Sequence, residues 1–388
     1  MSRKLVISLC MIARNEEKWL KMSLGSARQW VDEIILVDTG SQDRTMELAR
    51  EFGARIFQHR WQNSFALHRN QSLEYARGDW LLILDADEKL DQKTAPFLAG
   101  LTQIPECDAY FVDILHLSSD GGHTLQSTPR FFRNNAGLQF KGNIHETLIG
   151  LKGKCLRSPL RLIHHGFAQG PQVMRQKNLR NLALIRNWVE KEPKNPTALT
   201  YLAQTQMIWP ETAQQALTAG LKALELAKAR KTPARMLVRI YHPIWISLTQ
   251  LERHGEVVLW ANECRNSLPD YPDSYFSLTW AHLEMGHWEL VREAAQKFMN
   301  LQDHWRKNTP SYPYTQNLTL NLRHVVIKRW ILADMNLPGA EKELEFLFTK
   351  LLEEPKGPQT ARDLLADLSQ KGKPGLLERL KQIIHSSS

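Results

Sequence analysis

Cysteine is scarce in this sequence, and the glycine-rich signatures of common nucleotide-binding sites are absent. The 388 residues include four cysteines, none of which form a Cys-x-x-Cys pair. This usage disfavours a zinc site or a disulfide framework and suits a reducing cytoplasm. No Gly-x-Gly-x-x-Gly follows the first apolar run, and no Gly-x-x-x-x-Gly-Lys-Ser/Thr occurs anywhere. A Rossmann dinucleotide site and a P-loop are therefore both disfavoured.

Long apolar runs are also absent. No segment approaches the roughly 18 consecutive apolar residues of a membrane-spanning helix. Residues 2–13, SRKLVISLCMIA, imitate a signal peptide, but the apolar run is short and RNEEKW follows where small residues should stand. We expect a buried first strand here and no transmembrane segment. The expected location is the cytoplasm, with peripheral attachment to a membrane left open.

Acidic residues are outnumbered, which gives a formal net charge of +9. Such an excess raises nucleic acid or an acidic membrane surface as partners. Residues 130–180 contain ten basic residues and one acid, Glu146. This stretch suits either a solvated basic surface or a phosphate-binding site. We expect no nucleic-acid partner, because the predicted site also holds at least six acids, which repel a polyanion.

Short apolar runs alternate with helical patterns over the first hundred residues. The predicted strands are residues 4–12, 32–38, 54–59 and 79–85. The predicted helices are residues 16–30, 41–53 and 64–77. This rhythm predicts parallel strands joined by helical crossovers, and hence an open α/β sheet.

The pattern changes after about residue 100. Residues 109–118 and 129–134 read as strands, with a hairpin turn at SSDGGHT (118–124) between them. Helical patterns return from Gln172 and dominate to the end.

The helical half contains a weak internal repeat. Residues 241–272 align with residues 272–300, so that Gly255 matches Gly286, and residues 195–226 fit more loosely. This pattern resembles tetratricopeptide repeats, which are paired antiparallel helices of about 34 residues. A generic helical bundle is the alternative.

Polar clusters follow three of the predicted strands. ARNEE (13–17), DTGSQDRT (38–45) and DADE (85–88) all stand at carboxyl ends, and ligands of open parallel sheets bind at that edge. Each cluster alone reads equally well as a turn or a helix cap. Their coincidence favours one site, and clustered carboxylates there suggest a divalent cation.

Six segments in order resemble the nucleotide-sugar domain of family 2 glycosyltransferases, which have a GT-A fold. They are ISLCMIARNEEKWL, VDEIILVDTGSQDRT, FALHRN, GDWLLILDADEKL, FFRNNAGLQFKGNIHETL and LIHHGF. The resemblance covers roughly residues 4–170. It implies a GT-A domain with a mostly parallel sheet at residues 1–170 and an all-α, tetratricopeptide-like region at residues 171–388.

The resemblance implies roles for particular residues. Those implied to face the nucleotide are Ala13, Glu16 or Glu17, Asp38, Arg69 and Asp85, and Asp85 is implied to hold either the ribose or the metal shell. Asp87 is implied as the ligand of Mn²⁺ or Mg²⁺, with His164 completing the metal shell and His165 as the second choice. Asn70 is implied to support the site. His68 departs from the family pattern, which often has a small residue there, and its role stays open.

Direct displacement at the sugar carbon needs one base, because members of this family invert the anomeric centre. NIHE offers Glu146, which we favour, and His145. Glu88 is expected to cap the turn that follows it. Trp61, Trp80 and Trp188 are candidates for stacking on sugars, although most of the twelve tryptophans are expected in packing.

The implied activity is metal-dependent, inverting transfer from a nucleotide-sugar donor, expected to be UDP-linked. The acceptor is an unidentified saccharide, lipid-linked glycan or peptide. A protein or peptide partner, or a second copy of the chain, is expected to bind through the helical region. The alternative is a tetratricopeptide-type scaffold whose N-terminal domain is inactive, although clustered acids are costly to keep in an inactive domain.

Overall fold

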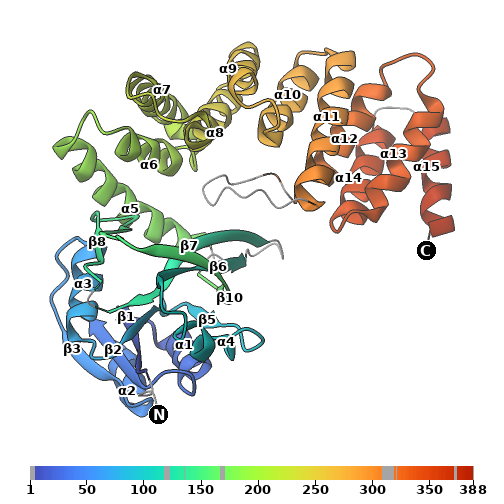
Figure 1. Ribbon diagram of the computed structural model, residues 1–388. Helices are drawn as coiled ribbons and strands as arrows, with labels where there is room; N and C mark the ends of the chain where they lie inside the picture. The colour runs from blue at the N-terminus through green and yellow to red at the C-terminus, as the bar shows by residue number, and fades with distance from the viewer. Residues whose placement is uncertain are drawn as a thin grey trace. The chain divides into compact units, whose positions relative to one another are not determined.

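The computed structural model describes residues 5–117, 123–134, 136–166, 171–307, 319, 321–370 and 374–387. The chain divides into two compact units, residues 1–188 and residues 189–388 (Figure 1). Within these described residues, the strands lie in the first unit and the second unit is built from helices.

An eight-stranded sheet forms the centre of the first unit, in the order β3-β2-β1-β4-β7-β6-β10-β5. Its strands are β1 (Ile7–Ala13), β2 (Glu33–Asp38), β3 (Arg55–Gln58), β4 (Trp80–Ile83), β5 (Glu88–Leu90), β6 (Cys107–Leu117), β7 (His123–Arg133) and β10 (Lys154–His164). Four of the seven neighbouring pairs are parallel, and only the pairs of β4 with β7, β6 with β7 and β10 with β5 are antiparallel. The sheet is therefore mostly parallel, as predicted.

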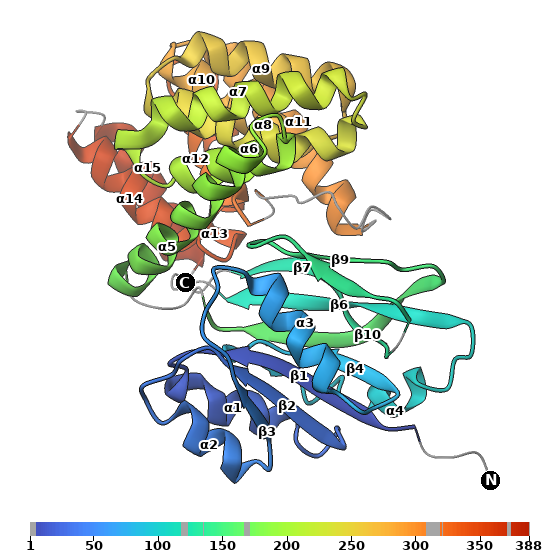
Figure 2. The same ribbon diagram turned by 90° about the vertical axis from the view of Figure 1, so that its left-hand side faces the viewer.

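Helices and a small hairpin cover the two faces of this sheet (Figure 2). The helices of this part are α1 (Glu17–Ala27), α2 (Thr45–Glu51), α3 (Phe65–Tyr75), α4 (Phe97–Leu101) and α5 (Pro171–Lys191), and the hairpin pairs β8 (Gln139–Lys141) with β9 (Thr147–Ile149). Leu9 and Met11 of β1 share a core with α1 and α4, whereas Cys10 shares one with α3 and β8. Alternate residues of a central strand are thus buried on opposite faces, which explains its continuous apolar run.

The predicted strands and helices of the first hundred residues are confirmed, with ends that differ by a few residues. The two later strands are also confirmed as an antiparallel pair, in which Leu117 pairs with His123. Residues 118–122 of the predicted turn lie outside the described residues. The sequence reasoning missed β5, β8, β9 and β10. The first three span only three residues each, and charged residues interrupt the apolar pattern of β10, KCLRSPLRLIH.

The second unit is a row of helices, each packed against the next along the chain. They are α6 (Pro196–Gln206), α7 (Ala213–Ala229), α8 (Ala234–Gln250), α9 (His254–Ser267), α10 (Pro272–Glu284), α11 (Trp288–Lys307), α12 (Arg323–Asp334), α13 (Glu341–Glu353), α14 (Gly357–Gln370) and α15 (Pro374–Ser387), with a 3₁₀ turn at Pro210–Thr212. The aligned repeats fall on the pairs α8–α9 and α10–α11, and the looser one falls on α6–α7. Leu248 and Leu278 are buried at matching places. The region is therefore helical and tetratricopeptide-like, as predicted.

None of the described helices is both long and apolar enough to span a lipid bilayer. Among the tryptophans considered for sugar stacking, Trp80 is fully buried and stacks on Phe131 with ring centroids 4.8 Å apart. Trp80 therefore belongs to the core of the sheet.

Candidate functional site

The carboxyl ends of β1 and β2 meet at one edge of the sheet, as predicted. Ala13 pairs in register with Asp38, and its carbonyl accepts a hydrogen bond from Thr39 N at 3.0 Å. Asn15 has a left-handed backbone (φ 55°), and its side chain accepts a hydrogen bond from Gln42 N at 2.8 Å. The loops that follow the two strands are therefore tied together.

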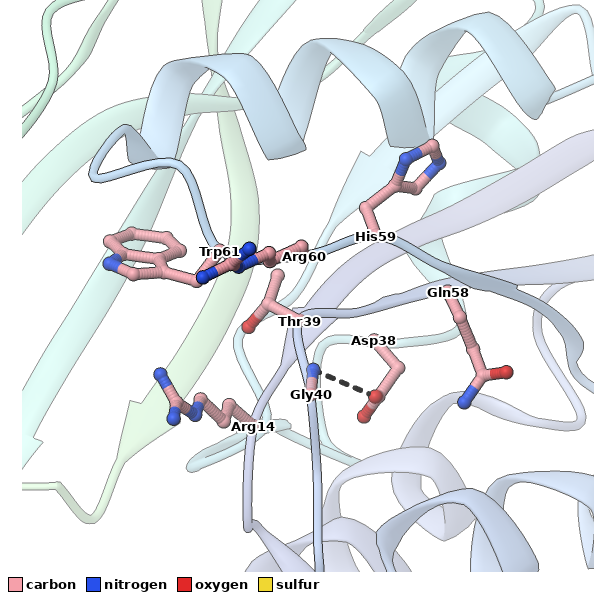
Figure 3. A pocket seen from close by; sticks show the side chains of 8 residues that line it. All are labelled: Arg14, Asp38, Thr39, Gly40, Gln58, His59, Arg60 and Trp61. Carbon is pink, nitrogen blue, oxygen red and sulfur yellow. Dashed lines mark hydrogen bonds between the residues drawn. The ribbon is translucent and has the colours of Figure 1, made fainter.

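A pocket of about 540 Å³ opens at this edge (Figure 3). Its lining residues are Arg14, Asp38, Thr39, Gly40, Gln58, His59, Arg60 and Trp61. Asp38 is fully buried, and its Oδ1 accepts hydrogen bonds from the backbone N of Gly40 and Ser41, each at 3.0 Å. Its Oδ2 is buried without a hydrogen-bond partner in the described part of the chain. Because an unsatisfied buried oxygen is costly, Asp38 offers an acceptor to a ligand of this pocket.

Trp61 borders the pocket and is held by His68. The two rings stack with centroids 5.2 Å apart. His68 Nε2 accepts a hydrogen bond from Gln62 N at 3.3 Å, and Nδ1 lies 2.8 Å from Gln71 Oε1. Burial lowers the pKa of His68, which favours the neutral ring. Because Nε2 accepts a hydrogen bond, the proton of the neutral ring lies on Nδ1. The residue whose role was open therefore orders the loop that carries Trp61.

The acids after β4 belong to a row of alternating charges, which we call the charge chain: Glu146, Arg69, Asp85, Arg130 and Glu88. Arg69 Nε lies 2.5 Å from Glu146 Oε1, and Arg69 Nη2 lies 2.7 Å from Asp85 Oδ1. Arg130 Nη2 lies 3.1 Å from both Asp85 Oδ2 and Glu88 Oε1. Two arginines, from α3 and β7, thus offset the repulsion between three carboxylates.

The arginines keep Asp85 ionised. Burial raises the pKa of Asp85, but the charges of Arg69 and Arg130 outweigh burial and hold that pKa well below its usual range. Burial raises the pKa of Glu88 in spite of the opposing charge of Arg130. Glu88 Oε2 accepts a hydrogen bond from Asp85 N at 2.9 Å. It therefore closes the turn that precedes it, and the expectation that it caps the following turn is wrong.

Asp87 faces a histidine and a lysine instead of an arginine. Asp87 Oδ1 lies 3.5 Å from His164 Nε2, and Oδ2 lies 3.4 Å from Lys177 Nζ of α5. Burial raises the pKa of Asp87, but the hydrogen bond and charge of His164 outweigh burial and lower it. The same contact raises the pKa of His164 against the effect of its own burial. The two residues named as metal ligands from DADE and LIHHGF are therefore in contact.

Gly166 keeps the space beside this pair open. A Cβ at this position would lie 2.3 Å from Asp87 Oδ2 and 2.5 Å from His164 Nε2. Within the described ranges, no cluster of three or more His, Cys, Asp or Glu residues could hold a metal ion. Mg²⁺ in phosphate-binding sites is usually held by one or two carboxylates together with phosphate oxygens and water. The two donors present fit a divalent cation that takes its other ligands from a bound diphosphate.

Two further histidines border the pair. His116 Nδ1 lies 3.0 Å from His164 Nδ1, and His116 Nε2 lies 3.2 Å from Gln126 Oε1. Burial, with the charge of His164 adding to it, lowers the pKa of His116 to about 4. His165, the second metal candidate, stacks on Trp19 of α1 with ring centroids 5.6 Å apart. Its ring therefore packs on the helix that follows β1.

The two glutamates of ARNEE have different surroundings. Glu16 is half-buried, and burial, with the charges of Asp87 and Asp85 adding to it, raises its pKa to about 7. Glu17 is exposed, and its Oε2 accepts a hydrogen bond from Arg44 N at 3.0 Å. Glu16 therefore lies within the electrostatic reach of the DADE acids, whereas Glu17 holds the loop after β2.

The two base candidates lie in the turn between β8 and β9. The Glu146 side chain is 12% exposed and bound to Arg69, and His145 is exposed with a positive φ of 51°. Asn70 holds this hairpin through two hydrogen bonds, from its Nδ2 to Phe140 O at 2.9 Å and from Phe140 N to its Oδ1 at 2.7 Å. Asn70 thus supports the segment that carries both candidates.

The structure adds seven residues that the sequence reasoning had not assigned to the site: Gln58, His59, Arg60, His116, Arg130, Gly166 and Lys177. Gln58, His59 and Arg60 lie at the carboxyl end of β3, so the rule used for the other strand ends could have found them. Arg130 and Lys177 belong to the basic stretch 130–180. A lone histidine and a lone glycine carry no sequence signal of their own.

The fold and the site define the protein as a transferase whose sheet is of the type found in enzymes that use nucleotide sugars. The sequence profile of the family described as Glycosyl transferase family 2 matches residues 8–155. A TPR repeat-containing protein of Synechococcus elongatus is 30% identical over 311 residues, which cover 75% of this chain and 74% of that protein. The SPbeta prophage-derived glycosyltransferase SunS of Bacillus subtilis is 27% identical over 206 residues, which cover 51% of this chain and 48% of SunS.

Among solved structures, residues 1–349 of S. aureus TarS, crystallised with UDP-GlcNAc, align at 12% identity with a TM-score of 0.37. The alignment covers 63% of this chain and 89% of that one. The chain belongs to glycosyltransferase family 2. Its first unit is a glycosyltransferase domain of the GT-A type, and a tetratricopeptide-like helical region follows it.

Proposed function

We propose that this glycosyltransferase uses a UDP-linked sugar donor together with Mn²⁺ or Mg²⁺ and inverts the anomeric carbon. The observation that carries the proposal is the contact between Asp87 and His164 at the edge where Asp38 opens into a pocket. This edge of the sheet thus has a place for a cation, at Asp87 and His164, beside a pocket for the nucleoside, at Asp38. Arg14 and Arg60 of the pocket add positive charge that suits a nucleotide.

The donor is proposed to lie with its nucleoside in the pocket at Asp38 and its diphosphate toward Asp87. Asp38 Oδ2 has an open acceptor position for an N–H or O–H of the nucleoside, and Trp61 offers an aromatic face. A cation held by Asp87 and His164 would stabilise the negative charge that develops on the diphosphate. Glu16 lies within electrostatic reach of Asp87, whose charge adds to burial in raising the pKa of Glu16.

Glu146 is proposed as the base of a single displacement. As an acceptor oxygen attacks the sugar C1, Glu146 takes its proton, and the bond between C1 and the diphosphate oxygen breaks with its electron pair leaving on UDP. Arg69 orients the Glu146 carboxylate through their 2.5 Å contact. His145, in the same turn, is the second candidate.

The acceptor is proposed to be a saccharide, a lipid-linked glycan or a peptide. The helical unit has a pocket of about 620 Å³ over α9, α10 and α11, where an acceptor, a protein partner or a second copy could bind. Its lining includes the charged residues Arg265, Glu293 and Lys297 and the histidine His282. We place the protein in the cytoplasm, with peripheral membrane attachment open, and its four unpaired cysteines support this location.

The proposal is tested by calorimetric titration of UDP into the full chain with and without Mn²⁺. Binding is expected only with the cation. Asp87→Asn should weaken binding by more than the roughly 10–100-fold that loss of an outer-shell partner costs. The matched control is Asp113→Asn, a half-buried carboxylate that alternation places on the other face of β6 from His116.

Two results would contradict parts of the proposal. UDP binding that is equal with and without Mn²⁺ removes the metal dependence. Unchanged binding in Asp87→Asn removes the assigned ligand. A screen of nucleotide sugars for metal-dependent hydrolysis then identifies the donor without an acceptor.

A further inference from the structure

Lys177 contacts the second oxygen of the carboxylate that we propose as a cation ligand. Its Nζ is 3.4 Å from Asp87 Oδ2, and the two side chains are 27% and 14% exposed. The lysine reaches this position from α5, a helix that follows LIHHGF in the chain. Among the described residues, Asp87 makes no ion pair with either arginine of the charge chain, so Lys177 supplies the positive charge that the arginines supply to Asp85 and Glu88.

Lys177 and a divalent cation compete for the same carboxylate. Mg²⁺ binds carboxylate oxygens at about 2.0–2.1 Å, and an ammonium group at hydrogen-bond range of that oxygen repels such an ion. Gly166 already leaves room for only a small group beside Oδ2, since a Cβ would approach to 2.3 Å. A cation that reaches Oδ2 would therefore displace the ammonium group.

A bound diphosphate would offer Lys177 a second anionic partner. The four-carbon stem of the lysine is flexible and ends in three rotatable donors, which suits a group that exchanges one anion for another. A diphosphate bound through the cation on Asp87 would bring phosphate oxygens within reach of that stem. Arg180, one helical turn further along α5, lies over the Phe65 ring at 5.3 Å and keeps a second positive charge on the same side of the helix.

We infer that Lys177 is an exchangeable cation that neutralises Asp87 in the empty enzyme and transfers to the diphosphate when cation and donor bind. It then acts as a catalytic residue, because it offsets the charge that the departing diphosphate gains as the C1–O bond breaks. The inference rests on the function proposed above and adds a role that the metal ligands alone do not supply.

Opposite effects on two affinities follow from this exchange. Removing the ammonium group removes the competitor of the cation and also removes a ligand of the diphosphate. Lys177→Met should therefore raise the affinity for Mn²⁺ alone by roughly fivefold, the size of a partly exposed ion pair. It should lower the affinity for UDP at saturating Mn²⁺ by roughly tenfold or more, the size of a hydrogen bond to a charged group.

The experiment uses the full chain and two titrations. Mn²⁺ alone is followed through the electron paramagnetic resonance signal of the free ion, and UDP at saturating Mn²⁺ is followed by calorimetry. Lys191→Met is the matched control, because Lys191 is exposed on the last turn of the same helix and carries the same charge. Lys177→Arg keeps the charge and should stay near the unaltered chain in both titrations.

A rise in Mn²⁺ affinity with a fall in UDP affinity, absent from Lys191→Met, supports the inference. A fall in both affinities assigns Lys177 a structural role and overturns it. Unchanged affinities in Lys177→Met, or a rise for Mn²⁺ with no change for UDP, also overturn it while the proposed function stands. No Mn²⁺ or UDP binding by the unaltered chain overturns the proposed function and this inference together.

Discussion

Replacing Arg130 by methionine should destabilise the first unit strongly. The substitution keeps an unbranched apolar stem and removes a guanidinium that contacts Asp85 and Glu88, each at 3.1 Å. Glu88 is the more sensitive partner, because its side chain is 2% exposed and Arg130 is its one salt-bridge partner among the described residues. Asp85 is 26% exposed and keeps Arg69 at 2.7 Å.

The magnitude follows from those two environments. Breaking a buried ion pair by removing one partner costs about 3–5 kcal/mol, because an uncompensated charge stays buried. The remaining arginine and the partial exposure of Asp85 discount its share, so we expect a loss of about 3 kcal/mol. For a unit of 188 residues, this loss corresponds to a fall of about 6–12 °C in melting temperature.

Differential scanning calorimetry of the full chain measures this loss, with the helical unit as an internal reference. The double variant Arg130→Met, Glu88→Leu removes both charges and should recover at least half of the loss, because apolar replacements of buried pairs are often neutral. A single variant that melts within about 2 °C of the unaltered chain would refute the reasoning. A double variant as unstable as the single one would show that packing, and not charge, holds this turn.

Three further predictions concern other parts of the site and sheet. Gly166→Ala should weaken Mn²⁺-dependent UDP binding at least about tenfold by filling the space beside Asp87. Calorimetry compares it with Gly100→Ala, whose Cβ would meet nothing within 4 Å. Equal UDP affinities of the two variants would contradict this prediction. Glu146→Gln should slow metal-dependent donor hydrolysis by about a hundredfold or more, as loss of a general base does, and a rate within threefold of the unaltered enzyme would exclude Glu146 as the base. Burial raises the pKa of Glu33, but hydrogen bonds from Ser8, Arg77 N and Arg55 outweigh burial and lower it. Glu33→Gln should therefore lower the free energy of unfolding by up to about 1 kcal/mol at pH 7. The stability that Glu33 contributes is present above its unfolded pKa of about 4.3 and is lost as pH falls through the lower folded value. Urea unfolding should therefore show a smaller difference between variant and unaltered chain at pH 3 than at pH 7, and an equal difference would refute the role of the lowered pKa.

Much of the fold could be predicted because local patterns carry it. Buried parallel strands are continuous apolar runs, and the intervening helices show their own period, so β1 to β4 and α1 to α3 were found. Short strands such as β5 have too few residues for a period. β10 runs between β6 and β5 with charged side chains at its exposed positions, so its pairing depends on neighbours far along the chain.

The site residues divide in the same way. Asp38, Asp85 and Asp87 could be predicted to share one edge because the carboxyl ends of parallel strands meet there, and His164 could be proposed because its motif resembles a family. Lys177 could not be predicted, because nothing local marks which lysine of a basic helix will reach an acid 90 residues away.

The sequence by itself determined the class of protein and which acids follow the carboxyl ends of the parallel strands. These are properties of residue order, since strand ends and family motifs are read along the chain. Only the tertiary structure decided how the acids differ. Asp85 and Glu88 are paired with arginines from α3 and β7, whereas Asp87 faces His164 and Lys177. These partners meet the acids only when segments that are distant in the chain fold together.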